Sequence, residues 1–260
     1  MSHNDMFSDL ARFYDPIMSH VDYDRWFFVT TTIAQLLQKP INHLDAACGT
    51  GRLGKKLHTA GWRSLGSDLS FSMLRMAKTR APKLPTVQAD LRALPYRGSF
   101  DYVTCLFDSI NFLLDLDSLH LAMKSLHGAI RDGGILYFDI VTERMVMEHF
   151  AGQEWTEQNG KITSTWSCKW HPDRALAETS IRINSGVAYT IYEHIHTFDE
   201  IDRALENAGF ELLGAFDAET WKSPGKRTVR VDYVAVKGSV KPYQKPFRDV
   251  RDQVKRLVVR

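Results

Sequence analysis

The sequence predicts an α/β fold: a doubly wound, mostly parallel seven-stranded sheet with a reversed last strand, plus a three-stranded antiparallel β insertion. Three observations predict it. Short apolar runs alternate with helical segments over residues 41–150, as in a parallel sheet with helical crossovers. Residues 155–197 alternate with a period of two, which is typical of antiparallel strands. A helix and two strand-like segments then follow at residues 198–237.

The N-terminal segment, residues 1–40, is expected to form a helical lid. Helical spacing of apolar residues covers residues 22–38, and Pro40 ends this helix. The strands of the sheet domain follow as apolar runs, at residues 41–47, 62–69, 86–91, 100–107 and 135–140. The helices between them are expected at residues 52–60, from the capping Ser70 to Pro82, and at residues 116–130.

The insertion is expected to cover one end of the sheet. Its strands are predicted at residues 162–170, 175–184 and 187–198, separated by turns. The chain then returns to a helix that ends at Gly209, and the last two strands pair in antiparallel fashion. The predicted organisation therefore has four parts. The lid is residues 1–40, and the sheet domain is residues 41–150 with 198–237. The insertion is residues 155–197, and the basic tail is residues 238–260.

A glycine-rich loop, HLDAACGTGRLG at residues 43–54, follows the first strand with G-x-G-x-x-G spacing. This spacing fits a dinucleotide, whose pyrophosphate would lie at the start of the next helix. Asp45 argues against that ligand, because a carboxylate at the end of the strand would repel the phosphates. The same carboxylate suits a cationic ligand, such as the amino group or sulfonium of S-adenosylmethionine. The loop also lacks the Gly-Lys-Ser/Thr ending of a phosphate-binding loop.

Two further acids end the next two strands. Asp68 follows the second strand and Asp90 the third. Ligands of open α/β sheets lie across the carboxyl ends of the strands, so these acids and Asp45 are expected to line one cleft. Asp68 would then face a ribose diol, and Asp90 an adenine amino group. A single acid at a strand end is usually a cap or turn residue, but three in register with a glycine loop favour a ligand.

These segments resemble the class I S-adenosylmethionine-dependent methyltransferases. LDAACGTG resembles that family's glycine loop, SDLSFSML its ribose-binding acid and adenine-packing methionine, and QADLRALP its adenine-contacting segment. CLFDSINFL is similar to the stretch after the fourth strand, and the reversed final strand matches too. The resemblance spans roughly residues 10–237. FYDPIM, YDRW and the insertion are most similar to the small-molecule subgroup, which includes glycine and amino-sugar N-methyltransferases.

The resemblance implies S-adenosylmethionine as the cofactor and a role for each matching residue. Asp45 would bind the amino group of its methionine portion, and Gly49 and Gly51 would pass beneath that portion. Asp68 would bind the ribose hydroxyls. Asp90 would accept a hydrogen bond from the adenine amine.

Further contacts follow from the same resemblance. Met73 and Leu91 would enclose the adenine, and Phe107 would face the cofactor from the fourth strand. Arg25 is a natural partner for the cofactor carboxylate, although an exposed helix arginine is an equally good interpretation. The residues that resemble the lid over this carboxylate are Tyr14, Tyr23, Arg25 and Trp26.

The insertion offers candidates for the acceptor site. Alternation places Tyr192, His194 and His196 on one face of a strand, and Trp166 and Trp170 on one face of another. His194 is the candidate general base, which an oxygen acceptor would need more than an amine. Packing of the insertion against the sheet is the alternative role for these residues. Glu143, just after the fifth strand, is another possible acceptor contact.

The predicted reaction is in-line transfer of a methyl group to N or O of a small molecule. The stretch after the fourth strand reads LFDS and lacks the Asn/Asp-Pro-Pro-aromatic motif of nucleic-acid amino-methyltransferases. One alternative is a macromolecular acceptor, tRNA or protein, docked through the tail. An alternative of another class is an NAD-dependent Rossmann oxidoreductase.

Bulk properties limit the remaining possibilities. Residues 237–260 carry eight Lys or Arg against two Asp, which leaves the rest slightly acidic and argues against a nucleic-acid partner. An apolar stripe in the tail predicts packing on its own domain or on a second copy, as a homodimer. Three scattered cysteines predict neither disulfides nor a metal site. We expect no membrane span and a cytoplasmic location, because no long apolar run or secretory signal is present.

Overall fold

The computed structural model describes residues 6–259, and its centre is a seven-stranded sheet in the order β10-β11-β5-β4-β1-β2-β3. The strands β1 to β5 run parallel, and β11 is antiparallel to both of its neighbours. The predicted mostly parallel sheet with a reversed last strand is therefore confirmed. Its strands are β1 Asn42–Ala46, β2 Arg63–Asp68, β3 Thr86–Gln88, β4 Phe100–Cys105, β5 Ile130–Val141, β10 Phe210–Asp217 and β11 Arg230–Lys237.

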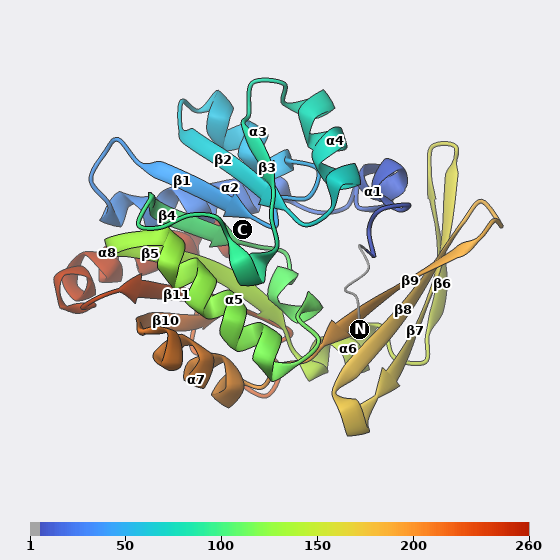
Figure 1. The fold of residues 1–260 in the computed structure, drawn as a ribbon. Helices are drawn as coiled ribbons and strands as arrows, with labels where there is room; N and C mark the ends of the chain where they lie inside the picture. The colour runs from blue at the N-terminus through green and yellow to red at the C-terminus, as the bar shows by residue number, and fades with distance from the viewer. Residues whose placement is uncertain (1–5, 260) are drawn as a thin grey trace.

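Helices cover both faces of this sheet (Figure 1). One face carries α5 and α7, and the other carries α2, α3 and α8, each with its apolar side toward the strands. The helices are α1 Ala11–Ile17, α2 Tyr23–Ile33, α3 Arg52–Thr59, α4 Phe71–Arg80, α5 Leu116–Ala129, α6 Glu143–His149, α7 Phe198–Ala208 and α8 Lys241–Val258. Short 3₁₀ turns lie at Ala34–Leu36, Leu91–Ala93, Ser109–Phe112 and Pro172–Arg174. None of the helices in the described part of the chain is long and apolar enough to cross a bilayer.

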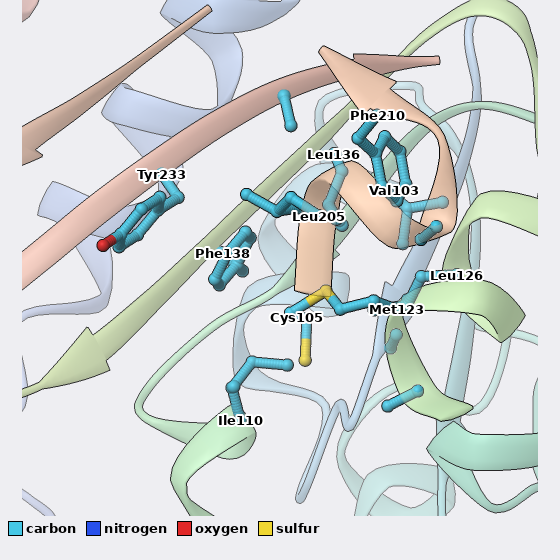
Figure 2. Close-up of a cluster of buried hydrophobic side chains, with 14 of the residues drawn as sticks. Val103, Cys105, Ile110, Met123, Leu126, Leu136, Phe138, Leu205, Phe210 and Tyr233 are labelled. Carbon is cyan, nitrogen blue, oxygen red and sulfur yellow. The ribbon is translucent and has the colours of Figure 1, made fainter. Parts of the chain in front are cut away.

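A large cluster of buried apolar side chains lies between the sheet and the helices α5 and α7 (Figure 2). Phe138 of β5 stacks on Tyr233 of β11, with ring centroids 5.0 Å apart. Met123, Leu126 and Leu205 project from the two helices onto the strands, and all three side chains are at most 2% exposed. Burial of this many apolar side chains fixes the positions of the strand ends, where the candidate site lies.

The C-terminal tail forms the helix α8 and packs on the protein's own sheet domain. Its buried residues Phe247, Val250 and Val254 lie against α2 and the Ala34–Leu36 turn. The predicted apolar stripe therefore contacts its own domain. Leu257 is the member of the stripe that stays exposed, at 36%.

The insertion is a separate antiparallel sheet that stands beside the main sheet (Figure 1). It contains four strands rather than three, β6 Glu154–Asn159, β7 Ile162–His171, β8 Leu176–Ile183 and β9 Ala188–His194. The additional strand β6 lies at the edge of this sheet. Trp155 is its one apolar residue, so β6 lacks the alternation of apolar residues that predicts the other three strands. The helix α1 contacts both this sheet and α4, and so bridges the insertion and the main domain.

Candidate active site

A first cavity of about 830 Å³ opens at the carboxyl ends of β1, β2, β3 and β4. Parallel strands present these ends at one edge of the sheet, which is why residues distant in sequence meet there. The insertion closes one side of the cavity, and α1 and α2 close another. Of the predicted cofactor residues, those that line this first cavity are Tyr14, Tyr23, Trp26, Asp45, Gly49, Asp68, Met73, Asp90, Leu91 and Phe107.

Asp45 is the most deeply placed charged group in the first cavity, with a 4% exposed side chain. Burial raises its pKa to about 7, although the Thr104 hydroxyl, which donates a hydrogen bond to Oδ1 at 3.0 Å, opposes that rise. Thr104 in turn bonds the buried ring of His43, and His43 bonds Ser64. Burial lowers the pKa of His43 to about 3, so this chain holds Asp45 in place without adding a positive charge. An approaching cation would therefore stabilise the ionised carboxylate.

Asp68 and Asp90 are held rigidly at the ends of their strands. Asp68 accepts hydrogen bonds from the backbone N–H of Gly49 at 2.7 Å and of Ser70 at 2.9 Å. It thereby ties the glycine loop to the start of α4. Asp90 accepts from the backbone N–H of Arg92 at 2.9 Å and pairs with the Arg92 guanidinium at 2.5 Å. The three acids lie in one cavity, as the sequence predicts for a single cleft.

Gly49 and Gly51 of the loop differ in their surroundings and in what a side chain there would meet. Gly49 lines the first cavity with φ +53°, and nothing lies within 4 Å of where its Cβ would be. Gly51 does not line this cavity; it begins α3 with φ +73°, and its Cβ position lies 3.0 Å from the Cβ of Ala77. A side chain at Gly51 would thus strain the turn and separate α3 from α4.

A second cavity of about 610 Å³ adjoins the first, and Tyr14, Trp26 and Phe107 line both. It lies between the insertion sheet, α6 and the carboxyl end of α1. Arg25 lies here and not in the first cavity: its guanidinium pairs with Asp232 and donates to the carbonyl of Ala218. The predicted position of Arg25 depended on the orientation of α2, which the sequence does not fix.

The loop that separates the two cavities is strained. Phe107 and Asp108, directly after β4, have φ +65° and +52°, which side chains adopt at a cost. The buried carboxylate of Asp139 holds both residues, accepting from their backbone N–H groups at 2.6 and 3.0 Å. Arg230 pairs with both Asp108 and Asp139. Burial raises the pKa of Asp139 to about 6, and Arg230 opposes that rise.

The residues predicted for the acceptor site lie in three different places: the first cavity, the second cavity, or outside both. Tyr192 and His194 line the first cavity, and Trp166 lines the second. Burial lowers the pKa of His194, which keeps its ring neutral and available as a base at neutral pH. His196 lies after the end of β9, is 2% exposed and bonds the carbonyl of Leu113 with its Nε2.

Trp170 and Glu143 line neither cavity. Trp170 packs with Cys168 and Val146 beneath the insertion. Glu143 is exposed in the first turn of α6. The short helix α6, which the sequence pattern did not predict, turns this residue away from the sheet ends.

His194, His196 and Glu200 place three potential metal-ligating atoms within 4.8 Å of one another. Two of them already serve the fold. Glu200 closes the capping box at the start of α7 by accepting from the backbone N–H of Thr197 at 2.8 Å, and His196 bonds Leu113. The helix cap and the Leu113 contact therefore account for Glu200 and His196.

The sequence reasoning missed the charged residues of the second cavity, above all Asp108, Glu193 and Arg230. Asp108 stands in the segment CLFDSINFL, directly after Phe107, the residue of this segment that the family resemblance indicates. Glu193 alternates with Tyr192 and His194, so the pattern places it on the opposite face of β9. Both faces of β9 line a cavity, because the strand lies between the two.

Comparisons with known proteins agree with this geometry. Residues 44–134 match a family model described as a methyltransferase domain. The chain is 29% identical over 243 residues to the putative methyltransferase YqeM of Bacillus subtilis (strain 168), covering 89% of this chain and 97% of that protein. It is 25% identical to a dTDP-4-amino-2,3,4,6-tetradeoxy-D-glucose N,N-dimethyltransferase of Saccharopolyspora spinosa, covering 77% and 85%. Among solved structures, it resembles an S-adenosylmethionine-dependent methyltransferase from Clostridium acetobutylicum, with a TM-score of 0.77, 23% identity and coverage of 90% and 99%.

The sheet order, the glycine loop and the three acids define a Rossmann-like domain with a cavity at the carboxyl ends of its strands. The matched methyltransferase domain at residues 44–134, the relatives and the shared fold support a class I S-adenosylmethionine-dependent methyltransferase, with S-adenosylmethionine as the cofactor. This confirms the family that the sequence motifs indicate. It leaves the alternative, an NAD-dependent oxidoreductase, without support.

Proposed function

We propose that the protein transfers the methyl group of S-adenosylmethionine to a nitrogen or oxygen atom of a small-molecule acceptor. The observation that carries this proposal is the pair of adjoining cavities, about 830 and 610 Å³, with Tyr14, Trp26 and Phe107 between them. The first cavity would hold the cofactor and the second the acceptor. Both volumes are within the usual range for small-molecule sites.

Residues of the first cavity fit the cofactor. The Asp45 carboxylate would pair with its amino group, and Asp68 would accept hydrogen bonds from its ribose hydroxyls. Met73 and Leu91 would pack on the adenine, and Asp90 would accept from the adenine amine. The bound cofactor supplies an electrophilic methyl group on a positively charged sulfur. The protein's part is to align that methyl group with the acceptor atom and to exclude water.

The size of the second cavity supports a small acceptor. The insertion sheet, α6 and the strained loop at Phe107 line it, and its volume of about 610 Å³ suits a small molecule. The basic tail, the proposed docking element for a tRNA or protein acceptor, is the helix α8 on the far edge of the core. The Saccharopolyspora relative, an amino-sugar dimethyltransferase by name, is consistent with a small acceptor.

Untargeted mass spectrometry tests this function. The protein is incubated with a metabolite extract and S-adenosylmethionine that carries a trideuterated methyl group. We expect a small molecule to gain one trideuteromethyl group while S-adenosylhomocysteine accumulates in equal amount. The matched control is Asp45→Asn, which should give much less of both products when the cofactor concentration is near the wild-type dissociation constant. Labelling of tRNA or protein in a whole-cell lysate, with no labelled metabolite, would contradict the proposal.

A further inference from the structure

The second cavity has more acidic than basic groups. Its charged lining consists of Asp22, Asp108, Glu157, Glu193 and Glu219 against Arg25 and Arg230. Both arginines already have carboxylate partners, Asp232 for Arg25 and Asp108 with Asp139 for Arg230. A bound cation would offset the remaining negative charge. A bound anion, such as a ligand with a carboxylate group, would increase the negative charge of the cavity.

Glu193 is the acid in this lining whose carboxyl group lacks a full set of partners. Its Oε1 atom is buried and has no hydrogen-bond partner within residues 6–259, although its residue lines the cavity. Burial is the main cause that raises the pKa of this carboxyl group well above its usual range, and the neighbouring Asp108 adds to the rise, while Arg230 opposes it. An unpaired buried oxygen is costly, and a donor from a ligand would remove that cost.

One wall of the second cavity, on the same face of the insertion sheet as Glu193, is aromatic. Trp155 and Trp166 are cross-strand partners on β6 and β7, and their rings stack with centroids 5.8 Å apart. Phe150 stacks on the other side of Trp155, at 5.7 Å. All three line the second cavity. Aromatic faces attract cations, so the wall and the carboxyl group favour the same ligand.

We propose that the acceptor is an amine, bound in the second cavity as its ammonium form, with Glu193 as the carboxylate that holds it. This inference rests on the proposed function and names its substrate class. Binding of the ammonium favours the ionised form of Glu193, and any proton on this carboxyl group leaves to solvent. The ammonium then gives one proton to the Glu193 carboxylate and becomes a neutral amine. The nitrogen lone pair forms the new C–N bond as the C–S bond breaks, the sulfur keeps that electron pair, and the product is an N-methylammonium.

Calorimetric titration of the protein saturated with S-adenosylhomocysteine tests this proposal. The probes are two pairs of equal shape, cyclohexylamine with cyclohexanol, and 2-phenylethylamine with 2-phenylethanol. We expect at least one amine to bind about tenfold or more tightly than its alcohol, as a charge-assisted hydrogen bond would provide. The variant Glu193→Gln should lose this preference. The variant Glu154→Gln, which changes an exposed carboxylate of the same sheet, should keep it.

The outcomes separate the two proposals. Failure to bind S-adenosylhomocysteine would contradict the proposed function itself. If the wild-type protein binds S-adenosylhomocysteine but binds neither amine more tightly than its matched alcohol, only the amine inference is overturned. This comparison uses the wild-type protein alone, so it does not depend on the folding of a variant. An unchanged preference in Glu193→Gln would also overturn it. In the labelling experiment, an O-methylated product would contradict the amine and leave the methyltransferase assignment standing.

Discussion

Replacing Asp45 by Asn removes the proposed partner of the cofactor amino group and keeps the shape of the side chain. A charge-assisted hydrogen bond of this kind contributes about 1.5–3 kcal/mol, so the dissociation constant for S-adenosylmethionine should rise about ten- to a hundredfold. The pKa of about 7 adds a second signature in the wild-type protein. Because only the ionised carboxylate pairs with the ammonium, each pH unit below about 7 should weaken binding about tenfold.

Calorimetry at a series of pH values measures both effects. In Asp45→Asn the affinity should no longer fall below pH 7, since no carboxylate remains to be protonated there. The variant should unfold at the same or a higher temperature than the wild type, because a neutral amide avoids the burial of a charge. Asp249→Asn, an exposed position on α8, is the matched control. An unchanged affinity, or an unchanged pH dependence in the variant, would refute the placement of the amino group at Asp45.

Three further predictions concern the cofactor site and the fold. Asp68→Asn should weaken S-adenosylmethionine binding about tenfold or more, because the ribose contact is lost. An unchanged affinity, measured by calorimetry, would contradict that contact. Leu205→Ala, a 2% exposed position on α7, should lower the free energy of unfolding by about 2–5 kcal/mol in urea, and a loss below 1 kcal/mol would show a poorly packed core. Removal of residues 239–260 deletes the buried side chains of Phe247, Val250 and Val254 and exposes the apolar surface of α2 that they cover, so it should cost about 5 kcal/mol or more. An unchanged melting temperature would mean that α8 contributes no stability.

The sheet could be predicted from the sequence because its strands are short apolar runs and its helices have clear caps. Ser70, for example, caps α4 with a hydrogen bond from Met73, and Gly209 ends α7 in the left-handed conformation. Strand β6 could not be predicted in the same way. It is half exposed along its length, and pairing with β7, rather than its own apolar pattern, makes it a strand.

The meeting of the three acids in one cavity could be predicted for a topological reason. Asp45, Asp68 and Asp90 stand at the ends of parallel strands, and such ends must meet at one edge of the sheet. Residues of the second cavity obey no such rule. Glu193 and Arg230 come from the insertion and the last strand, and their meeting with Asp108 depends on how the insertion docks. Arg25 likewise pairs with Asp232 because α2 packs across β11, a long-range contact that local sequence does not encode.

A crystal structure of the protein with S-adenosylhomocysteine tests the central claim most directly. We predict that the ligand fills the first cavity, with its amino group within about 3 Å of the Asp45 carboxylate and its ribose hydroxyls at Asp68. The sulfur should point past Phe107 toward the second cavity. A ligand bound elsewhere, or bound with its amino group far from Asp45, would contradict the account.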